Sequence, residues 1–250
     1  MTSDIKTIIH KFKKLALDIF APRKCAGCKK RNESFCAGCV RESFKYGAGC
    51  VFCNFRNNTG KICKQCRIKY EAPVFQILWA GEYKQPVKNA VKELKYKKRL
   101  ELAQPLGELI YRKFTEYYPK HQKEDFAVMP IPMHPKKEYA RGYNQAQLLA
   151  REFSKLSGIL LPTSDFQLLK VTDTKTQVET KKRDERIKNL EGAFAISTKN
   201  DPNLVWVKDK TIILIDDVAT TGATFMHASR ALQKAGFEKI ICLAIAHGYG

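Results

Sequence analysis

The chain has 250 residues, of which 44% are hydrophobic and 28% are charged, and 45 Lys and Arg residues stand against 25 Asp and Glu residues. This composition excludes a low-complexity chain and is that of a globular, soluble protein with one sizeable core plus a small module. The net charge of +20 favours nucleic acid or an acidic partner, with a solvated cationic surface as the alternative.

Residues 1–21 place apolar side chains at helical spacing, with lysines between them, which predicts a basic amphipathic helix. No apolar run there approaches the roughly 20 residues of a membrane span or the roughly 7 of a signal-peptide core. We therefore expect no transmembrane segment and a cytoplasmic location. The helix packs on the rest of the protein or, alternatively, lies on the inner face of the membrane or on a partner.

Eight of the nine cysteines form four Cys-x-x-Cys pairs within residues 22–71. Two such pairs supply the four thiolates of a closed structural Zn²⁺ site, so the segment is predicted to be a double zinc ribbon with two ions. Disulfides are the alternative, which a reducing cytosol disfavours. Pairing neighbours in sequence is the simplest arrangement, although a cross-braced one stays open. The predicted ligands are Cys25, Cys28, Cys36 and Cys39 on one ion, and Cys50, Cys53, Cys63 and Cys66 on the other.

The basic charge is concentrated near the cysteines. Residues 1–70 hold 16 Lys and Arg residues but only 4 Asp and Glu residues. Eight thiolates and two Zn²⁺ ions would lower the charge of the chain to about +16, because metal binding deprotonates the cysteines. The chain stays strongly basic after this correction, as single-stranded DNA binding requires.

Glu71–Pro73 marks a junction, after which residues 72–250 form a second domain. Strands and helices alternate in its first half, which predicts a mostly parallel α/β sheet flanked by helices. The expected elements are a strand over 74–83, helices over 87–94 and 100–114, a strand over 126–129 stopped by prolines, a polar loop, and a helix that opens at Arg141.

The last third of the chain carries the clearest functional pattern. The uninterrupted apolar run 212–215 predicts a strand covered on both faces, and Asp216 and Asp217 follow at its C-terminal end. The small residues 220–224 then lead into a helix over 225–234, whose N-terminus favours a phosphate. Cys242 lies in a later apolar run and is interpreted as a small buried residue.

This stretch closely resembles the phosphoribosyl-pyrophosphate (PRPP) signature of type I phosphoribosyltransferases. The resemblance implies that Asp216 and Asp217 engage the ribose hydroxyls and that the following loop wraps the 5′-phosphate. The alternative is an ordinary strand, turn and helix cap, which requires neither paired acids nor this density of Thr and Gly. The loop residues implied to bind PRPP are Ala219, Thr220, Thr221, Gly222, Ala223 and Thr224.

Over almost the full chain, the combined motifs resemble the ComF family of competence proteins. The motifs are the four cysteine pairs, Pro130–His134, Arg141–Gln145 and the PRPP signature, with weaker agreement at Leu94–Lys97 and at Gln177, Arg186 and Asn189. The resemblance implies a double zinc ribbon joined to a phosphoribosyltransferase domain, in proteins linked to DNA uptake during natural transformation.

In type I enzymes a second loop holds the pyrophosphate, and it corresponds here to residues 131–134, which include Met133 and His134. Cations and Mg²⁺ directed at this group would assist displacement at the ribose C1. For His134, a turn residue that never touches ligand is the alternative. Arg141 is predicted to be catalytic, since a cation at a helix start opposes the helix dipole and gains little local stability there.

Residues 168–194 are polar and correspond to the hood of type I enzymes, which would exclude water during transfer. Within them, Gln177, Arg186 and Asn189 are further site candidates. A solvated face is the alternative interpretation of this charged run.

Two functions from different classes follow. One is a transferase that moves phosphoribosyl from PRPP to an unknown acceptor. The other is a non-catalytic PRPP sensor that binds single-stranded DNA or a helicase-like partner through its basic surface and zinc ribbons. A zinc-stabilised scaffold with an idle site is a third interpretation.

Overall fold

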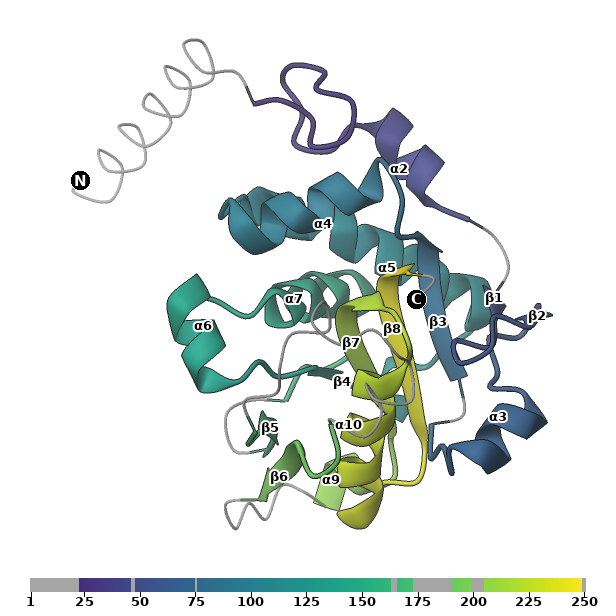
Figure 1. Ribbon diagram of the computed structural model, residues 1–250. Coiled ribbons are helices and arrows are strands. Elements are labelled where there is room, and N and C mark those ends of the chain that lie inside the picture. The colour runs from purple at the N-terminus through teal and green to yellow at the C-terminus, as the bar shows by residue number, and fades with distance from the viewer. Residues whose placement is uncertain are drawn as a thin grey trace.

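The computed structural model describes residues 23–45, 48–74, 76–162, 166–172, 190–198 and 205–248 (Figure 1). The helix predicted over residues 1–21 lies outside these ranges, as do Gln177, Arg186 and Asn189. Within the ranges, every helix is too short or too polar to cross a bilayer.

Four parallel strands form the central sheet, in the spatial order β3-β8-β7-β4, which confirms the predicted α/β architecture. Strand β7 is covered on both faces, because Ile212 and Leu214 belong to one hydrophobic core and Ile213 and Ile215 to the other. The uninterrupted apolar run therefore has the burial expected of a central parallel strand. The strands are β3 (Gln76–Glu82), β4 (Phe126–Pro130), β7 (Thr211–Ala219) and β8 (Ile240–His247).

Helices cover both faces of this sheet (Figure 1). One face packs against α4 (Val87–Tyr96), α5 (Ala103–Tyr117) and α7 (Gln145–Ser157). The other packs against α10 (Ala223–Lys234) and an antiparallel hairpin of β5 (Phe166–Lys170) and β6 (Phe194–Thr198). Short connecting elements are η1 (Leu100–Leu102), η2 (Lys123–Asp125) and α9 (Val205–Lys208).

The segment after β4 differs from the prediction. A helix, α6 (Pro135–Arg141), replaces the expected polar loop, with proline in its first turn and Gly142 in the left-handed conformation, φ 87°, after its end. Asn144 then caps α7 by accepting a hydrogen bond from the Ala146 N–H. Arg141 is therefore the last residue of a helix, where a cation complements the dipole. The prediction that it begins a helix was wrong.

The cysteine-rich segment is built into the two cores. It contains α2 (Ala37–Ser43), β1 (Ala48–Gly49), β2 (Arg56–Asn57) and α3 (Lys64–Lys69). Cys25, Cys36 and Cys39 pack in the core beneath α4 and α5, whereas Cys50 and Cys66 pack in the core beneath α10.

The same segment covers the outer edge of β3. The Lys45 N–H donates to the Ala80 carbonyl at 2.8 Å, and the Ile77 N–H donates to the Gly60 carbonyl at 3.1 Å. Approach is so close at Gly81 that a Cβ there would lie 1.9 Å from the Ser43 carbonyl oxygen. These contacts satisfy an edge that would otherwise be open to pairing. The domain division at residue 71 stays a prediction, and the parts on either side of it share both cores.

Candidate functional site

The two predicted acids lie near the C-terminal end of β7. Asp216 is partly exposed, whereas Asp217 is only 3% exposed. The Asp217 N–H donates to Asp216 Oδ1 at 2.8 Å, which fixes the orientation of the first carboxylate. Of the two, Asp216 is therefore the acid that a ligand reaches more directly.

Asp217 is turned onto a cation from another element. Its Oδ2 forms an ion pair with Nζ of Lys95, in the last turn of α4, and the two side chains are 4% and 20% exposed. Gln145, the first residue of α7, is a further polar neighbour that favours the ionised form of this carboxylate and helps to lower its pKa. The ion pair joins residues 122 positions apart and holds α4 against β7.

These surroundings give the two acids different proton affinities. Burial and the adjacent Asp217 charge raise the pKa of Asp216 well above its ordinary value. Burial alone would also raise the pKa of Asp217, but the Lys95 ammonium and the surrounding hydrogen bonds outweigh it and lower that pKa. Asp217 is thus the ionised partner of Lys95, and Asp216 is the acid that more readily keeps a proton.

Arg141 reaches the acids through Gln145. Its Nη1 donates to Gln145 Oε1 and lies 3.5 Å from the sulfur of Met133, while its guanidinium stacks 5.4 Å from the ring centroid of Tyr96. Four elements, α4, α6, α7 and β7, therefore meet at one cluster. Lys95 and Gln145 were not predicted as site residues, although both stand in motifs that the sequence analysis singled out.

The predicted phosphate loop connects β7 to α10. Gly222 adopts φ 75° immediately before the helix, and no side chain caps the helix from that position. Thr221 is buried and its Oγ1 accepts from the Ala223 N–H at 3.4 Å. The amides of the first turn of a 12-residue helix thus follow the strand that carries the two acids, and such a helix N-terminus favours an anion.

The second predicted loop lies between β4 and α6. His134 accepts a hydrogen bond from the Lys136 N–H at 3.3 Å and so caps α6. Asn144 donates to the Ile131 carbonyl at 3.0 Å and holds the loop against α7. Met133 and His134 also line a cavity of about 800 Å³, and neither acid is among the described residues around it.

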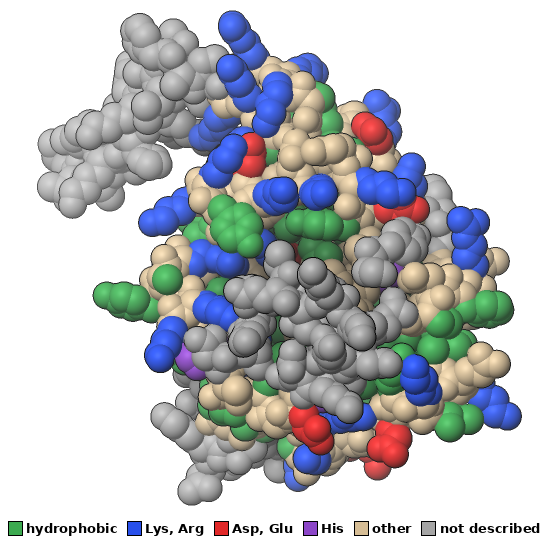
Figure 2. Space-filling view, viewed as in Figure 1, with side chains coloured by type: hydrophobic (Ala, Val, Ile, Leu, Met, Phe, Trp, Pro, Cys, Tyr) green, Lys and Arg blue, Asp and Glu red, His purple; other side chains and the backbone are tan. Residues whose placement is uncertain are grey.

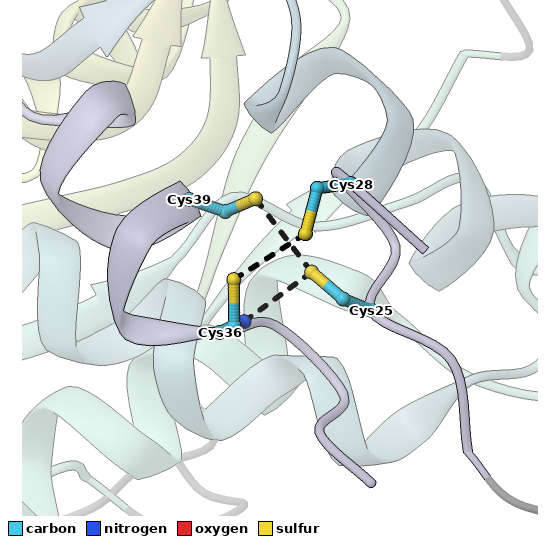
Figure 3. Close-up of side chains that lie close together, drawn as sticks. All are labelled: Cys25, Cys28, Cys36 and Cys39. Atoms are coloured by element: carbon cyan, nitrogen blue, oxygen red, sulfur yellow. Dashed lines mark hydrogen bonds between the residues drawn. The ribbon is translucent and has the colours of Figure 1, made fainter. Parts of the chain in front are cut away.

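The eight clustered cysteines form two groups, Cys25/Cys28/Cys36/Cys39 and Cys50/Cys53/Cys63/Cys66, which confirms the sequential arrangement over the cross-braced one. In each group the sulfurs lie within 4.8 Å of one another. Figure 3 shows the first group converging, with sulfur separations of 3.6 Å for Cys25–Cys39 and 3.5 Å for Cys28–Cys36. Tetrahedral ligands at about 2.3 Å from Zn²⁺ lie about 3.8 Å apart, so this geometry fits a metal ion.

One thiol of the first group is prepared to ionise. Burial opposes the ionised form of Cys25, but backbone N–H groups, led by that of Cys36, outweigh it and lower the pKa to about 6. The Cys36 N–H lies 3.3 Å from the Cys25 sulfur. Such amide donors are the usual surroundings of a thiolate ligand.

The fold and this site define a phosphoribosyltransferase-like protein. Residues 139–248, which hold Arg141, Gln145, both acids and the phosphate loop, match the phosphoribosyl transferase domain family. The chain is 29% identical to Competence protein F of Haemophilus influenzae over 86% of each chain. It is also 29% identical to Competence protein ComFC of Bacillus subtilis, over 70% of this chain and 67% of that one.

A third relative, the DNA utilization protein YhgH of Escherichia coli K12, is 22% identical over 70% of this chain and 72% of its own length. The matches to the two competence proteins extend well beyond the transferase domain, because they cover more of the chain than residues 139–248. Over most of its length the chain is therefore similar to these competence proteins, in agreement with the resemblance of its motifs to the ComF family.

Proposed function

We propose that this protein binds PRPP, with Asp216 and Asp217 at the ribose hydroxyls and the loop from Ala219 to Thr224 around the 5′-phosphate. The observation that carries the proposal is a partly exposed acid six residues before Gly222, the residue at the N-terminus of α10, which has no side chain to cap the helix. Carboxylates suit the diol or a Mg²⁺ ion, and the amides suit the phosphate. Asp217 would contribute to the sugar site together with Lys95, which already neutralises it.

In an active enzyme, an acceptor nucleophile would attack the ribose C1 while the bond from C1 to the pyrophosphate oxygen breaks. Mg²⁺, held with PRPP near Asp216, would supply charge neutralisation of the leaving group. Arg141 would act by fixing Gln145 and the Met133 loop, which are its contacts. This gives Arg141 a positioning role in place of the catalytic role expected from the sequence.

The two cysteine groups support a second part of the proposal, that each holds one structural Zn²⁺. Four sulfurs per group leave no ligand position for a substrate. The metals would then act on the fold and on docking, rather than in the chemistry.

The names of the relatives support a cellular role. Two are named as competence proteins and a third as a DNA utilization protein. We therefore place the PRPP site in a protein that acts in DNA uptake. The acceptor would be part of, or attached to, the DNA-handling machinery.

A non-catalytic PRPP sensor that binds single-stranded DNA is the second candidate. It is favoured by one surface, which we call the α4–α6 surface: exposed Tyr96 and Tyr139 with the exposed lysines Lys97, Lys98 and Lys136. Figure 2 shows Lys and Arg side chains gathered over α2, α4 and α6. Aromatic rings beside cations are the elements of a single-strand binding surface.

Calorimetry with PRPP and Mg²⁺ tests the first proposal. We expect saturable binding to the wild-type chain, and a loss of roughly ten- to a hundredfold in affinity for Asp216→Asn, because a hydrogen bond to a charged group contributes about 1.5–3 kcal/mol. Asp125→Asn is the matched control, since Asp125 is exposed and precedes β4 at the opposite end of the sheet. Absence of wild-type binding would overturn the proposal, and release of pyrophosphate with an acceptor would separate transferase from sensor.

Salt titration of single-stranded DNA binding tests the second candidate. Phosphate contacts predict that the logarithm of the affinity falls linearly with the logarithm of the salt concentration. Tyr139→Ala should weaken binding by about 1–3 kcal/mol through lost stacking, without changing the salt slope. Leu156→Ala serves as the control, because Leu156 is an exposed apolar residue near the C-terminal end of α7 and is not part of the α4–α6 surface. A flat salt response excludes this surface as a DNA site.

A further inference from the structure

The second cysteine group lies directly against the predicted phosphate loop. A Cβ on Gly222 would be 2.7 Å from Cγ1 of Val51 and 3.1 Å from Cε1 of Phe52, the two residues between Cys50 and Cys53. Both apolar side chains are fully buried. Val51 and Phe52, at the tip of the cysteine turn, therefore pack against the predicted phosphate loop at Gly222.

A polar connection joins the same turn to the other end of the loop. His247, at the end of β8 and 1% exposed, has Nδ1 2.7 Å from the Ala219 carbonyl and Nε2 2.9 Å from Oδ1 of Asn54. Since the Ala219 carbonyl and Asn54 Oδ1 can both only accept, a ring N–H donates to each of them, and in this arrangement both Nδ1 and Nε2 of His247 carry a proton. Asn54, which follows the cysteine turn, is therefore linked through His247 to Ala219, the first residue of the loop.

The position of Asn54 depends on the cysteine turn. Asn54 adopts φ 62°, its N–H donates to the Cys50 carbonyl at 2.8 Å, and the Cys50 N–H donates to the Phe55 carbonyl at 2.8 Å. Asparagine tolerates this left-handed conformation better than most residues do. A metal ion bound by Cys50 and Cys53 fixes both ends of the turn, and with them the direction of the Asn54 side chain.

We propose that Val51, Phe52 and Asn54 are positioning residues for the phosphate loop, so that metal binding at the second cysteine group and PRPP binding at Thr220–Thr224 strengthen each other. This inference rests on the proposed PRPP site. Coupling between two sites is reciprocal, and typical values change affinity by about 5- to 150-fold. Two sets of contacts would transmit this coupling: the apolar packing at Gly222 and the hydrogen bonds through His247 to Ala219.

The first cysteine group provides a matched control within the chain. Lys29 occupies the equivalent turn position, with φ 67° and its N–H donating to the Cys25 carbonyl at 3.0 Å. Its side chain, however, pairs with Glu93 of α4 at 3.2 Å and is 56% exposed. The same substitution at Lys29 therefore changes a cysteine turn without touching the loop, and Glu93 keeps its ion pairs with Lys97 and Arg99.

The test compares Asn54→Gly with Lys29→Gly in the full chain, each loaded with zinc. Glycine keeps the left-handed conformation and removes only the side chain. For Asn54→Gly we expect two zinc ions per chain as in the wild type, PRPP affinity weakened about five- to tenfold, and about tenfold faster hydrogen exchange at the amides of residues 220–223. Lys29→Gly should match the wild type in all three. Asn54→Asp keeps an oxygen facing His247 and should restore slow exchange.

Two outcomes overturn the inference: unchanged affinity and exchange in Asn54→Gly, or equal losses in both glycine variants. If the wild type fails to bind PRPP, the proposed function fails, yet the exchange comparison still decides whether the second cysteine group holds the loop. If the wild type binds PRPP but Asn54→Gly leaves the hydrogen exchange of the loop unchanged, the coupling is excluded and the proposed PRPP site is not.

Discussion

Asp217→Asn is expected to lower the free energy of unfolding by about 3 kcal/mol, whereas Asp216→Asn should leave it unchanged or raise it. Removing one partner of a buried ion pair costs about 3–5 kcal/mol, because the remaining charge is left without compensation. The lower end applies because the Lys95 side chain keeps 20% of its surface exposed. Chemical denaturation of the two variants at neutral pH measures both effects.

The difference between these variants should depend on pH. The folded-state pKa of Asp217 is lowered, so its contribution to stability is present above the unfolded value of about 3.9 and is lost as the pH falls through the folded value. The pKa of Asp216 is raised, so its effect has the opposite sign: stability is lost as the pH rises from about 3.9 toward the folded value. Asp216→Asn removes that loss.

A double variant provides the control for the ion pair. Lys95→Met combined with Asp217→Asn removes both charges and should be more stable than Asp217→Asn alone, because no unpaired ammonium remains. If Asp217→Asn were as stable as the wild type at pH 7, Lys95 would not be bound to Asp217 in solution. That result would leave both acids available to the sugar.

Removing the metal ions is expected to have the other large effect. Chelation should release two ions per chain and lower the melting temperature by about 10 °C or more, since structural zinc sites supply folding energy directly and 1 kcal/mol corresponds to about 2–4 °C in a chain of this size. The reason lies in the packing: the two cysteine groups contribute side chains to both cores of the sheet. Elemental analysis and scanning calorimetry measure the two quantities.

The ninth cysteine is the natural control for this experiment. Cys242 is fully buried in β8, outside both groups, so Cys242→Ala should keep two ions per chain and lose only the small packing contribution of one sulfur. Cys50→Ala should lose one ion and much of the stability. A metal-free chain with the wild-type melting temperature would show that the cysteines need no ion, and mass spectrometry would then reveal any disulfides.

Local patterns were sufficient for several parts of the fold. The apolar run over residues 212–215 predicted a strand covered on both faces, because only a central parallel strand buries every side chain. The spacing of the cysteines predicted two groups of four, since each pair lies in a tight turn and neighbouring pairs meet first. In both cases, the residue types and spacing of a short segment are enough to determine its local structure.

The error at Arg141 has a local cause as well. Pro135 and Gly142 stand in the positions that begin and end a short helix, and these two residues place Arg141 at its end. A helix of seven residues has too few periodic positions for its apolar spacing to stand out.

From sequence alone, the pair of acids, the loop of small residues before α10 and the two groups of four cysteines could be predicted, because each is a short run of residues with its own chemistry. Tertiary structure alone decided which acid is partly exposed, which is paired with a lysine, and which residues pack against the loop. The Lys95–Asp217 ion pair and the Asn54–His247 hydrogen bond join residues 122 and 193 positions apart. Such contacts exist only after the sheet brings α4, the cysteine turn and the ends of β7 and β8 together, and no local pattern encodes that distance.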